Sequence, residues 1–391
     1  MANTLKFGNE NWATKEDSIL AYNDENDNFK PLPFTTSRAS TATRVNKSGL
    51  IETVASGIPR VDYLGNTKGF HLLEPQSTNV VPYSQVTTGW TLSNVTEIQN
   101  ALISPDGTLN ASKFTTSALA VNIKFQTVTV NPETTYTYSF YCNYVGGDGL
   151  QGRFYDNTNG QNIEFYNYMS QIEQGKWTRV TRTFTTPVGC TNIQIWYLAL
   201  SSTFPVIASY WGAQLEQGSY ASSYIPNFGT ALGVTRLADT ASQTVPSGII
   251  NSSEGVLYAE ISALSNEGDT YRTISLNDGS GTITNRILIG YTDTNNVYAQ
   301  VNNTVIGITG VNSNLKVSNK LAVVYNGSVA KLFFNGTQVG TGITTAPTLT
   351  GLDNITSSSG AVTSVFEGKI KDLKVYNTAL TDAELVTLTR V

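Results

Sequence analysis

Two Asn-Gly dipeptides set between short apolar runs constrain the fold of this chain more than any other feature. Asn326-Gly327 separates Leu321–Tyr325 from Val329–Phe334, and Asn335-Gly336 follows that second run. Asn-Gly is a strong hairpin signal because both central residues of a type I′ turn require positive φ. The sequence therefore predicts a β-meander in this region.

Apolar and polar side chains alternate in other parts of the chain, with the period of a half-buried strand. Tyr136, Tyr138, Phe140 and Cys142 form one such face, and turn signals such as Gly146–Gly149 separate the runs. This pattern is typical of antiparallel sandwiches. We expect a closing strand at Ile370–Tyr376 followed by a short helix, and that helix begins with a capping box of Thr381 and Glu384.

The composition agrees with an all-β fold. Charged residues make up 14% of the 391, against roughly 25% in an ordinary domain, while 20 Tyr, 15 Phe and 5 Trp supply cores. The net charge of −5, without a basic stripe, argues against nucleic acid as a partner. No apolar run approaches the ~20 residues that span a bilayer, so we expect no membrane insertion. Cys142 and Cys190 are expected to be buried free thiols, and the alternative is a single disulfide across a sandwich.

The N-terminal part of the chain lacks the strand pattern of the later parts. Residues 1–33 are polar and acidic, with a short helix expected at Thr14–Tyr22, and nothing there builds its own core. We therefore expect residues 1–70 to be ordered only through contacts with other chains. Deleting residues 1–33 is expected to leave two folded sandwiches and to abolish incorporation into a larger particle. The start of the sequence lacks the basic and apolar pattern of a signal peptide, so synthesis in a cytoplasm without export by such a signal is expected.

Catalytic patterns are weak. His71 is the single histidine, which leaves at most one base for a Ser-His-Asp or Cys-His mechanism, and we expect it to be structural. Glycoside hydrolysis needs two opposed carboxylates. The nearest run begins at Glu267 and Asp269, but Arg272 stands where a glucanase-type motif requires its last carboxylate. We expect no catalytic residues, no enzymatic activity and no cofactor; a structural calcium ion is left open without assigned ligands.

Sugar binding without hydrolysis needs only aromatic faces and polar groups. One hairpin, Arg153–Tyr168, combines both, and the alternative is that its aromatic rings pack in a core or a subunit contact. The candidate glycan-binding residues are Phe154, Tyr155, Asp156, Asn159, Gln161, Asn162, Phe165, Tyr166 and Tyr168.

Three stretches carry resemblances to known families. Residues 34–65 and 72–79 resemble the N-terminal segment of phage structural proteins, including those of crAss-like and other Bacteroidetes phages. Residues 89–226, with GKWTRVTRTF and WGAQLEQGSYASSYIP, are similar to carbohydrate-binding-module jelly rolls. Residues 254–385 resemble the laminin-G-like, concanavalin A-like sandwich. In the first stretch, the motif assigned to virion anchoring consists of Arg38, Thr43, Arg44, Gly49, Leu50, Ile51, Pro59, Arg60, Asp62 and Tyr63.

These resemblances imply an extended virion-anchoring segment (1–69), a jelly roll (70–228), a linker (229–253) and a laminin-G-like sandwich (254–391). The implied protein is a non-enzymatic virion component: a head fibre, a decoration protein or a tail-associated protein. Its implied partners are other virion proteins, host or mucus glycans, and further copies of itself as a homotrimer by analogy with phage fibres. A receptor-binding tail fibre or polysaccharide depolymerase and a bacterial lectin are the alternatives.

Overall fold

The computed structural model describes residues 5–10, 12–22, 29–86, 89–116, 122–199, 205–246, 248–266, 270–310, 314–361 and 363–391. Antiparallel strands dominate it, as the sequence predicts. The chain divides into two compact units. Unit 1 combines residues 1–41, 54–75 and 237–391, and unit 2 combines residues 42–53 and 76–236. Among the described residues, no helix has the length and apolar character needed to cross a membrane.

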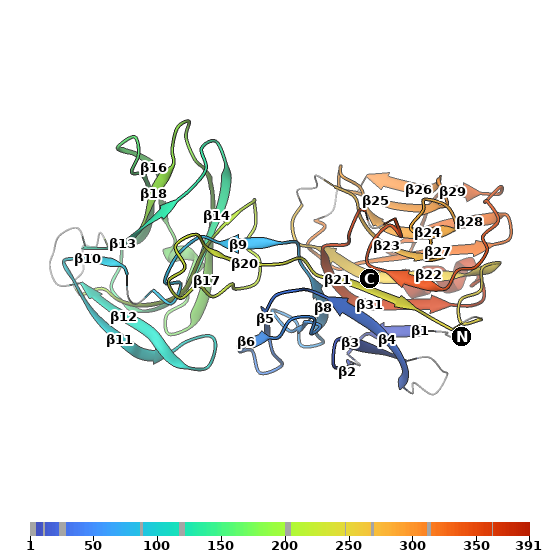
Figure 1. Ribbon diagram of the computed structural model, residues 1–391, viewed down its shortest axis with the longest axis horizontal. Coiled ribbons are helices and arrows are strands. Elements are labelled where there is room, and N and C mark those ends of the chain that lie inside the picture. The colour runs from blue at the N-terminus through green and yellow to red at the C-terminus, as the bar shows by residue number, and fades with distance from the viewer. Residues whose placement is uncertain are drawn as a thin grey trace. The chain divides into compact units, whose positions relative to one another are not determined.

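Unit 2 is a sandwich of two antiparallel sheets (Figure 1). The first sheet has the order β10 (Thr91–Ser93), β13 (Asn122–Thr129), β18 (Asn192–Ala199), β15 (Leu150–Asp156) and β16 (Gln161–Asn167). The second has the order β11 (Val95–Ile103), β12 (Leu109–Thr116), β19 (Ile207–Gln217), β14 (Thr135–Gly146) and β17 (Trp177–Thr185). Two further pairs are β5 (Ala42–Val45) with β6 (Ile51–Val54) and β9 (Ser77–Asn79) with β20 (Val234–Arg236), and the 3-10 helix η1 is Met169–Gln171.

Aromatic side chains fill the space between the sheets of unit 2. The rings of Tyr197 and Tyr210 stack with centroids 4.2 Å apart. Their hydroxyls pair with those of Tyr138, at 2.6 Å, and Tyr168, at 2.9 Å. Each of these four buried hydroxyls therefore has a partner, which removes the penalty for burying it. Cys142 is a free, buried thiol in the same core, and Cys190 is free and buried as well, as expected.

Unit 1 is a second antiparallel sandwich. One layer has the order β26 (Thr304–Gly310), β25 (Asn296–Val301), β24 (Arg286–Tyr291), β23 (Arg272–Asn277), β30 (Asn354–Thr356), β21 (Thr240–Thr244) and β4 (Phe29–Ser37). The other has the order β29 (Thr337–Ile343), β28 (Val329–Phe334), β27 (Asn319–Asn326), β22 (Glu254–Ala263) and β31 (Gly368–Tyr376), which pairs with both β1 (Leu5–Gly8) and β8 (Phe70–Leu73). The short strand β7 (Val61–Asp62) pairs with β8.

The N-terminal residues belong to this second sandwich, which corrects the expectation that they are ordered only by other chains. β1 pairs with β31 along four residues, from Leu5 opposite Val375 to Gly8 opposite Asp372. Leu5 and Phe7 are buried in the core of unit 1. Figure 1 shows β1 and β31, the first and last strands of the chain, side by side. No local sequence pattern predicts this pairing, because the two strands are more than 360 positions apart.

The prediction of a helix at Thr14–Tyr22 is wrong. These residues form a hairpin of β2 (Thr14–Lys15) and β3 (Ser18–Tyr22). Ile19 and Ala21 are buried two positions apart, which is the period of a strand. Burial against the core of unit 1 therefore outweighs the helix propensity of this segment.

The meander predicted from the Asn-Gly dipeptides is present, with one difference. Asn335 and Gly336 both have positive φ between paired Phe334 and Thr337, as a type I′ turn requires. The other turn lies one residue later than expected, because Asn326 pairs with Val329 and leaves Gly327 and Ser328 at the centre. The closing strand is followed by α1 (Asp382–Thr389), whose capping box of Thr381 and Glu384 forms as predicted.

The units differ from the predicted domain boundaries. The laminin-G-like sandwich was expected to start at residue 254, but unit 1 starts its C-terminal portion at residue 237 and includes β21. The predicted linker 229–253 is thus divided between the units, and its part in unit 1 includes the strand β21. Residues 42–53, predicted to belong to the anchor, lie in unit 2.

Candidate functional site

The outer face of the first sheet of unit 2 carries a row of large side chains at one register. Phe125 lies opposite Trp196, Trp196 opposite Arg153, and Arg153 opposite Phe165, so the row crosses β13, β18, β15 and β16. Directly opposed side chains in a sheet are close enough to pack together. We call these four residues the aromatic row.

Arg153 is held at the centre of the aromatic row by rings. Its guanidinium carbon lies 4.3 Å from the centroid of Trp196, 4.5 Å from that of Tyr155 and 4.9 Å from that of Phe165. These are cation–π distances. Burial lowers the pKa of Arg153. Within the described residues, its Nε has no hydrogen-bond partner, so the rings rather than polar groups position this side chain.

A polar row runs beside the aromatic row, two residues away on β13, β18 and β15 and three residues away on β16, where the register shifts. Thr127 lies opposite Gln194, Gln194 opposite Tyr155, and Tyr155 opposite Asn162. The amide groups and hydroxyls of this row are donors and acceptors of the kind that bind sugar hydroxyls. Aromatic rings beside them supply the apolar surface that the C–H face of a sugar needs.

The structure separates the nine residues that the sequence analysis proposed for glycan binding. Tyr155, Asn162 and Phe165 lie on the outer face, where Phe165 is 49% exposed. Gln161 is exposed at the start of β16. The remaining five, considered next, have structural roles.

Phe154, Tyr166 and Tyr168 are buried in the core of unit 2, so their assignment to a glycan site is wrong. Phe154 stacks on Phe184 with centroids 4.0 Å apart. These three point inward because strand residues alternate between faces, and Phe154 lies between the outward-facing Arg153 and Tyr155.

Asp156 and Asn159 form the turn between β15 and β16. The Asp156 carboxylate accepts hydrogen bonds from the backbone N–H groups of Thr158 and Asn159, both at 3.0 Å, and from Asn159 Nδ2 at 2.7 Å. Burial opposes ionisation of Asp156, but these hydrogen bonds lower its pKa. Asp156 is fully buried and therefore a structural residue rather than a sugar ligand.

Sequence reasoning missed Phe125, Arg153 and Trp196 as site residues. Each lies on a different strand, and the register that unites them joins segments up to about 70 residues apart. The one available signal was the alternation of β18, in which Ile193, Ile195 and Tyr197 are buried. That alternation requires Trp196 to face outward.

The motif assigned to virion anchoring is used largely inside the chain. In unit 1, buried Arg38 and Arg60 both form ion pairs with Asp239, and Arg60 also binds Glu74 at 2.5 Å. Asp62 is buried and its carboxylate accepts from the backbone N–H of Leu64. Pro59 immediately precedes Arg60, and Tyr63 packs on the core of unit 1.

The other half of the motif lies in unit 2. Thr43 donates to the carbonyl of Tyr224 at 2.6 Å, and Arg44 pairs with Glu52 at 2.7 Å. Ile51 is buried beside Tyr224 and Trp211, while Gly49 adopts a positive φ in the hairpin turn. Leu50, at the same turn, is 40% exposed, so it offers an apolar side chain to an external partner.

His71 is buried and lies 3.4 Å from the hydroxyl of Thr36. Burial lowers its pKa to about 4, with Asp239 opposing and Arg60 and Arg38 reinforcing that shift. Glu267 and Asp269, the carboxylates considered for hydrolysis, lie outside the described residues, and Arg272 is buried at the start of β23. In the part of the chain that the structure describes, no three His, Cys, Asp or Glu side chains gather as a metal ion requires.

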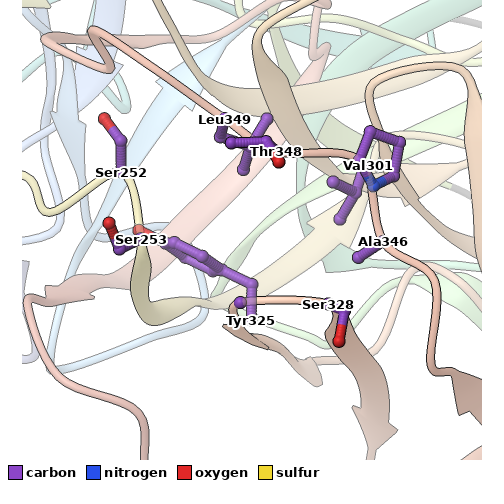
Figure 2. A pocket seen from close by; sticks show the side chains of 10 residues that line it. Ser252, Ser253, Val301, Tyr325, Ser328, Ala346, Thr348 and Leu349 are labelled. Atoms are coloured by element: carbon purple, nitrogen blue, oxygen red, sulfur yellow. The ribbon is translucent and has the colours of Figure 1, made fainter.

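A cavity of about 250 Å³ lies in unit 1 beside Tyr325 (Figure 2). Figure 2 shows the ring of Tyr325 extending toward Ser253, and its hydroxyl already donates to the carbonyl of Asn251 at 2.6 Å. The described lining has no charged side chain, so it offers little to orient a polar ligand. The lining residues are Ser252, Ser253, Val301, Tyr325, Gly327, Ser328, Ala346, Pro347, Thr348 and Leu349.

Comparison with known proteins agrees with this architecture. The laminin G model described as the concanavalin A-like lectin/glucanases superfamily matches residues 238–386, which lie within unit 1. The chain therefore carries a concanavalin A-like, laminin G-type domain beside a second β-sandwich. Among curated proteins, no sequence matches this chain.

Solved structures that match part of this chain include carbohydrate-binding modules. The CBM40 of the Ruminococcus gnavus IT-sialidase, bound to α2,3-sialyllactose, is 21% identical over 36% of this chain and 84% of that chain, with a TM-score of 0.29. A family 16 carbohydrate-binding module is 15% identical over 35% and 99%, with a TM-score of 0.27. The enzymatically active domain of tailspike protein 4 from bacteriophage CBA120 is 16% identical over 36% and 21%, with a TM-score of 0.29.

Proposed function

We propose that this chain is a non-enzymatic structural protein of a bacteriophage particle that binds host-surface or mucus glycans through the aromatic row. The observation that carries the binding function is the alignment of Phe125, Trp196, Arg153 and Phe165 across four strands. A sheet that faces only water has no need to place three aromatic side chains and a stacked arginine together on its outer face.

The chemistry of the row suits a saccharide. Aromatic rings contact the C–H faces of sugar rings, and Arg153 supplies N–H donors whose orientation three aromatic rings fix in advance. A donor that is already positioned loses little conformational entropy when it binds a ligand. Each contact in such an open site is weak, and display in many copies would raise the avidity.

The virion role rests on a different observation, which is the resemblance of residues 34–79 to the N-terminal segment of phage structural proteins. Because Arg38 and Arg60 are occupied by Asp239 and Glu74, we assign attachment to exposed surfaces of the segment, with Leu50 the first candidate. The head fibre, decoration and tail-associated positions all remain compatible with this role.

A glycan array tests the binding function. The full chain is expected to bind a restricted set of glycans, and Trp196→Ala is expected to weaken binding at least tenfold, or about 1.4 kcal/mol. Phe228→Ala is the matched control, because Phe228 is an aromatic residue of unit 2 that is 67% exposed and outside the row. Equal binding by the Trp196 variant and the parent chain would refute the proposed site.

Two further measurements test the remaining parts of the proposal. Mass spectrometry of purified phage particles is expected to find the chain at a fixed copy number, and its absence would refute the virion role. The glycans that bind on the array are expected to show no new reducing ends after incubation with the chain. Release of reducing sugar would point instead to a depolymerase.

A further inference from the structure

A second cavity lies in unit 1, on the face of β23, β24 and β25 that points away from the core. Its volume is about 230 Å³. Leu288 lies opposite Gln300 in neighbouring strands, and Ser359, Thr363 and Ser364 border the cavity on another side. The lining residues are Tyr271, Thr273, Ile283, Arg286, Leu288, Tyr298, Gln300, Ser359, Thr363 and Ser364.

Arg286 gives this cavity a positive charge. The side chain is 7% exposed, and its guanidinium donates to the carbonyl of Ser359 at 2.8 Å and to Oε1 of Gln300 at 3.1 Å. Its Nε has no hydrogen-bond partner in the described residues. Within the same described ranges, Arg286 forms no ion pair with a carboxylate. A buried cation that meets only neutral acceptors is electrostatically unsatisfied.

Comparison with Arg60 shows that Arg286 lacks an anionic partner. Burial alone would lower the pKa of Arg60, but Glu74 and Asp239 reverse the direction and raise it. Burial also lowers the pKa of Arg286, and only Tyr298 opposes that shift, so its pKa stays lowered. Both arginines are in unit 1, so the same fold neutralises one buried cation and leaves the other facing a cavity.

The walls of the cavity suit a ring with one apolar face. Tyr271 is 39% exposed and meets the ring of Tyr298 edge-on, with centroids 5.5 Å apart. Leu288 adds apolar surface, while Thr363 and Gln300 add polar groups. The volume lies below the roughly 300–1,000 Å³ of drug-sized sites, so it suits one monosaccharide residue rather than an oligosaccharide.

We propose that this cavity binds a single carboxylate-bearing sugar residue, with the carboxylate paired to Arg286 and the sugar ring against Tyr271. The planar guanidinium matches a carboxylate in geometry as well as in charge. The site lies in a different compact unit from the aromatic row and is argued from different residues, so it does not depend on the function proposed above.

Calorimetry on the full chain tests the site with methyl glycosides of glucuronic acid, galacturonic acid and N-acetylneuraminic acid, and of glucose and galactose as neutral controls. At least one acidic glycoside is expected to bind ten times more tightly than the neutral ones. Arg286→Gln is expected to abolish that preference, whereas Arg272→Gln is expected to keep it. Arg272 is the matched control because it is equally buried in the same sheet but does not line the cavity.

Several outcomes would overturn the proposal: equal binding of acidic and neutral glycosides, no binding of either, or an unchanged preference in the Arg286 variant. Competition by acetate or inorganic phosphate at equal concentration would reduce the site to a general anion site. If Arg286→Gln does not fold, the Tyr271→Ala variant tests the site instead. Unchanged affinity of that variant for acidic glycosides would refute the site. Acidic glycosides must still bind to Trp196→Ala, which separates this site from the aromatic row.

Discussion

The guanidinium of Arg38 lies 2.8 Å from Oδ1 of Asp239, although 201 positions separate the two residues in sequence. Arg60 binds the other oxygen of the same carboxylate, and all three side chains are buried. Asp239 thus ties two parts of the N-terminal segment to the start of the laminin G-type domain. Arg38 and Arg60, which belong to the motif that resembles a phage segment, therefore hold parts of unit 1 together.

Loss of that carboxylate is expected to be costly. Asp239→Ala leaves two buried arginines short of an anionic partner, and removing one partner of a buried pair typically costs about 3–5 kcal/mol. The exposed pair of Lys331 and Asp382 is the control, since Asp382→Ala is expected to cost at most about 1 kcal/mol. Urea unfolding of both variants measures the difference. Similar losses in the two variants would contradict the role given to Asp239.

His71 is expected to make unit 1 sensitive to mild acid. Burial lowers its pKa to about 4, below its ordinary value of 6.5, so the unfolded chain takes up a proton that the folded chain refuses. Stability is therefore lost as the pH falls from about 6.5 to 4, by up to roughly 3 kcal/mol. Unfolding free energies of the parent chain and His71→Gln at pH 7 and pH 4.5 measure this. An identical pH dependence in both proteins would exclude His71 as its source.

A glycine in β15 is expected to be irreplaceable for steric reasons. A Cβ at Gly152 would overlap the ring of Tyr166, the residue that it pairs with in β16. Gly152→Ala is expected to destabilise unit 2 by about 1–3 kcal/mol, as overpacking does. Gly146→Ala is the control, because a Cβ there meets no atom within 4 Å. Thermal unfolding compares the two, and an equal melting temperature would contradict the clash.

Removal of the first strands is expected to destabilise unit 1 rather than to leave it intact. Deleting residues 1–22 removes Leu5, Phe7 and Ile19 from the core and uncovers an edge of β31. Each buried large apolar side chain contributes about 1.5–3 kcal/mol. Hydrogen exchange on the truncated chain is expected to show lost protection in β31 and retained protection in β14 of unit 2. Full protection of β31 would contradict this prediction and would favour a separate N-terminal anchor.

The local parts of the fold were predictable from sequence, and the long-range parts were not. Alternation identified the buried face of Tyr138 and Phe140, and the turn chemistry of Asn335-Gly336 identified a hairpin, because both depend on neighbours within a few residues. Leu5 and Phe7 belong to a four-residue strand whose partner lies at the other end of the sequence, so no local pattern shows where they pack.

The same limit explains the candidate site. Tyr155 and Phe165 stand in one hairpin and were predicted, whereas Phe125 and Trp196 join them only through the register of β13 and β18. A one-residue slip in that register would turn the rings to the other face. Sequence alone does not fix a register between strands that distant.

The position of β31 also sets an order of events during synthesis on the ribosome. β31 completes the layer between β22 and β1, so β1 can pair with β3 early but lacks its four-residue pairing with β31 until the end of the chain has been translated. At roughly 5–20 residues per second this wait lasts on the order of tens of seconds. Unit 2 is complete at residue 236 and is free to fold during that interval. Nascent chains halted near residue 360 should therefore contain a folded unit 2 and an incomplete unit 1. The incomplete unit exposes apolar core residues that a chaperone must protect.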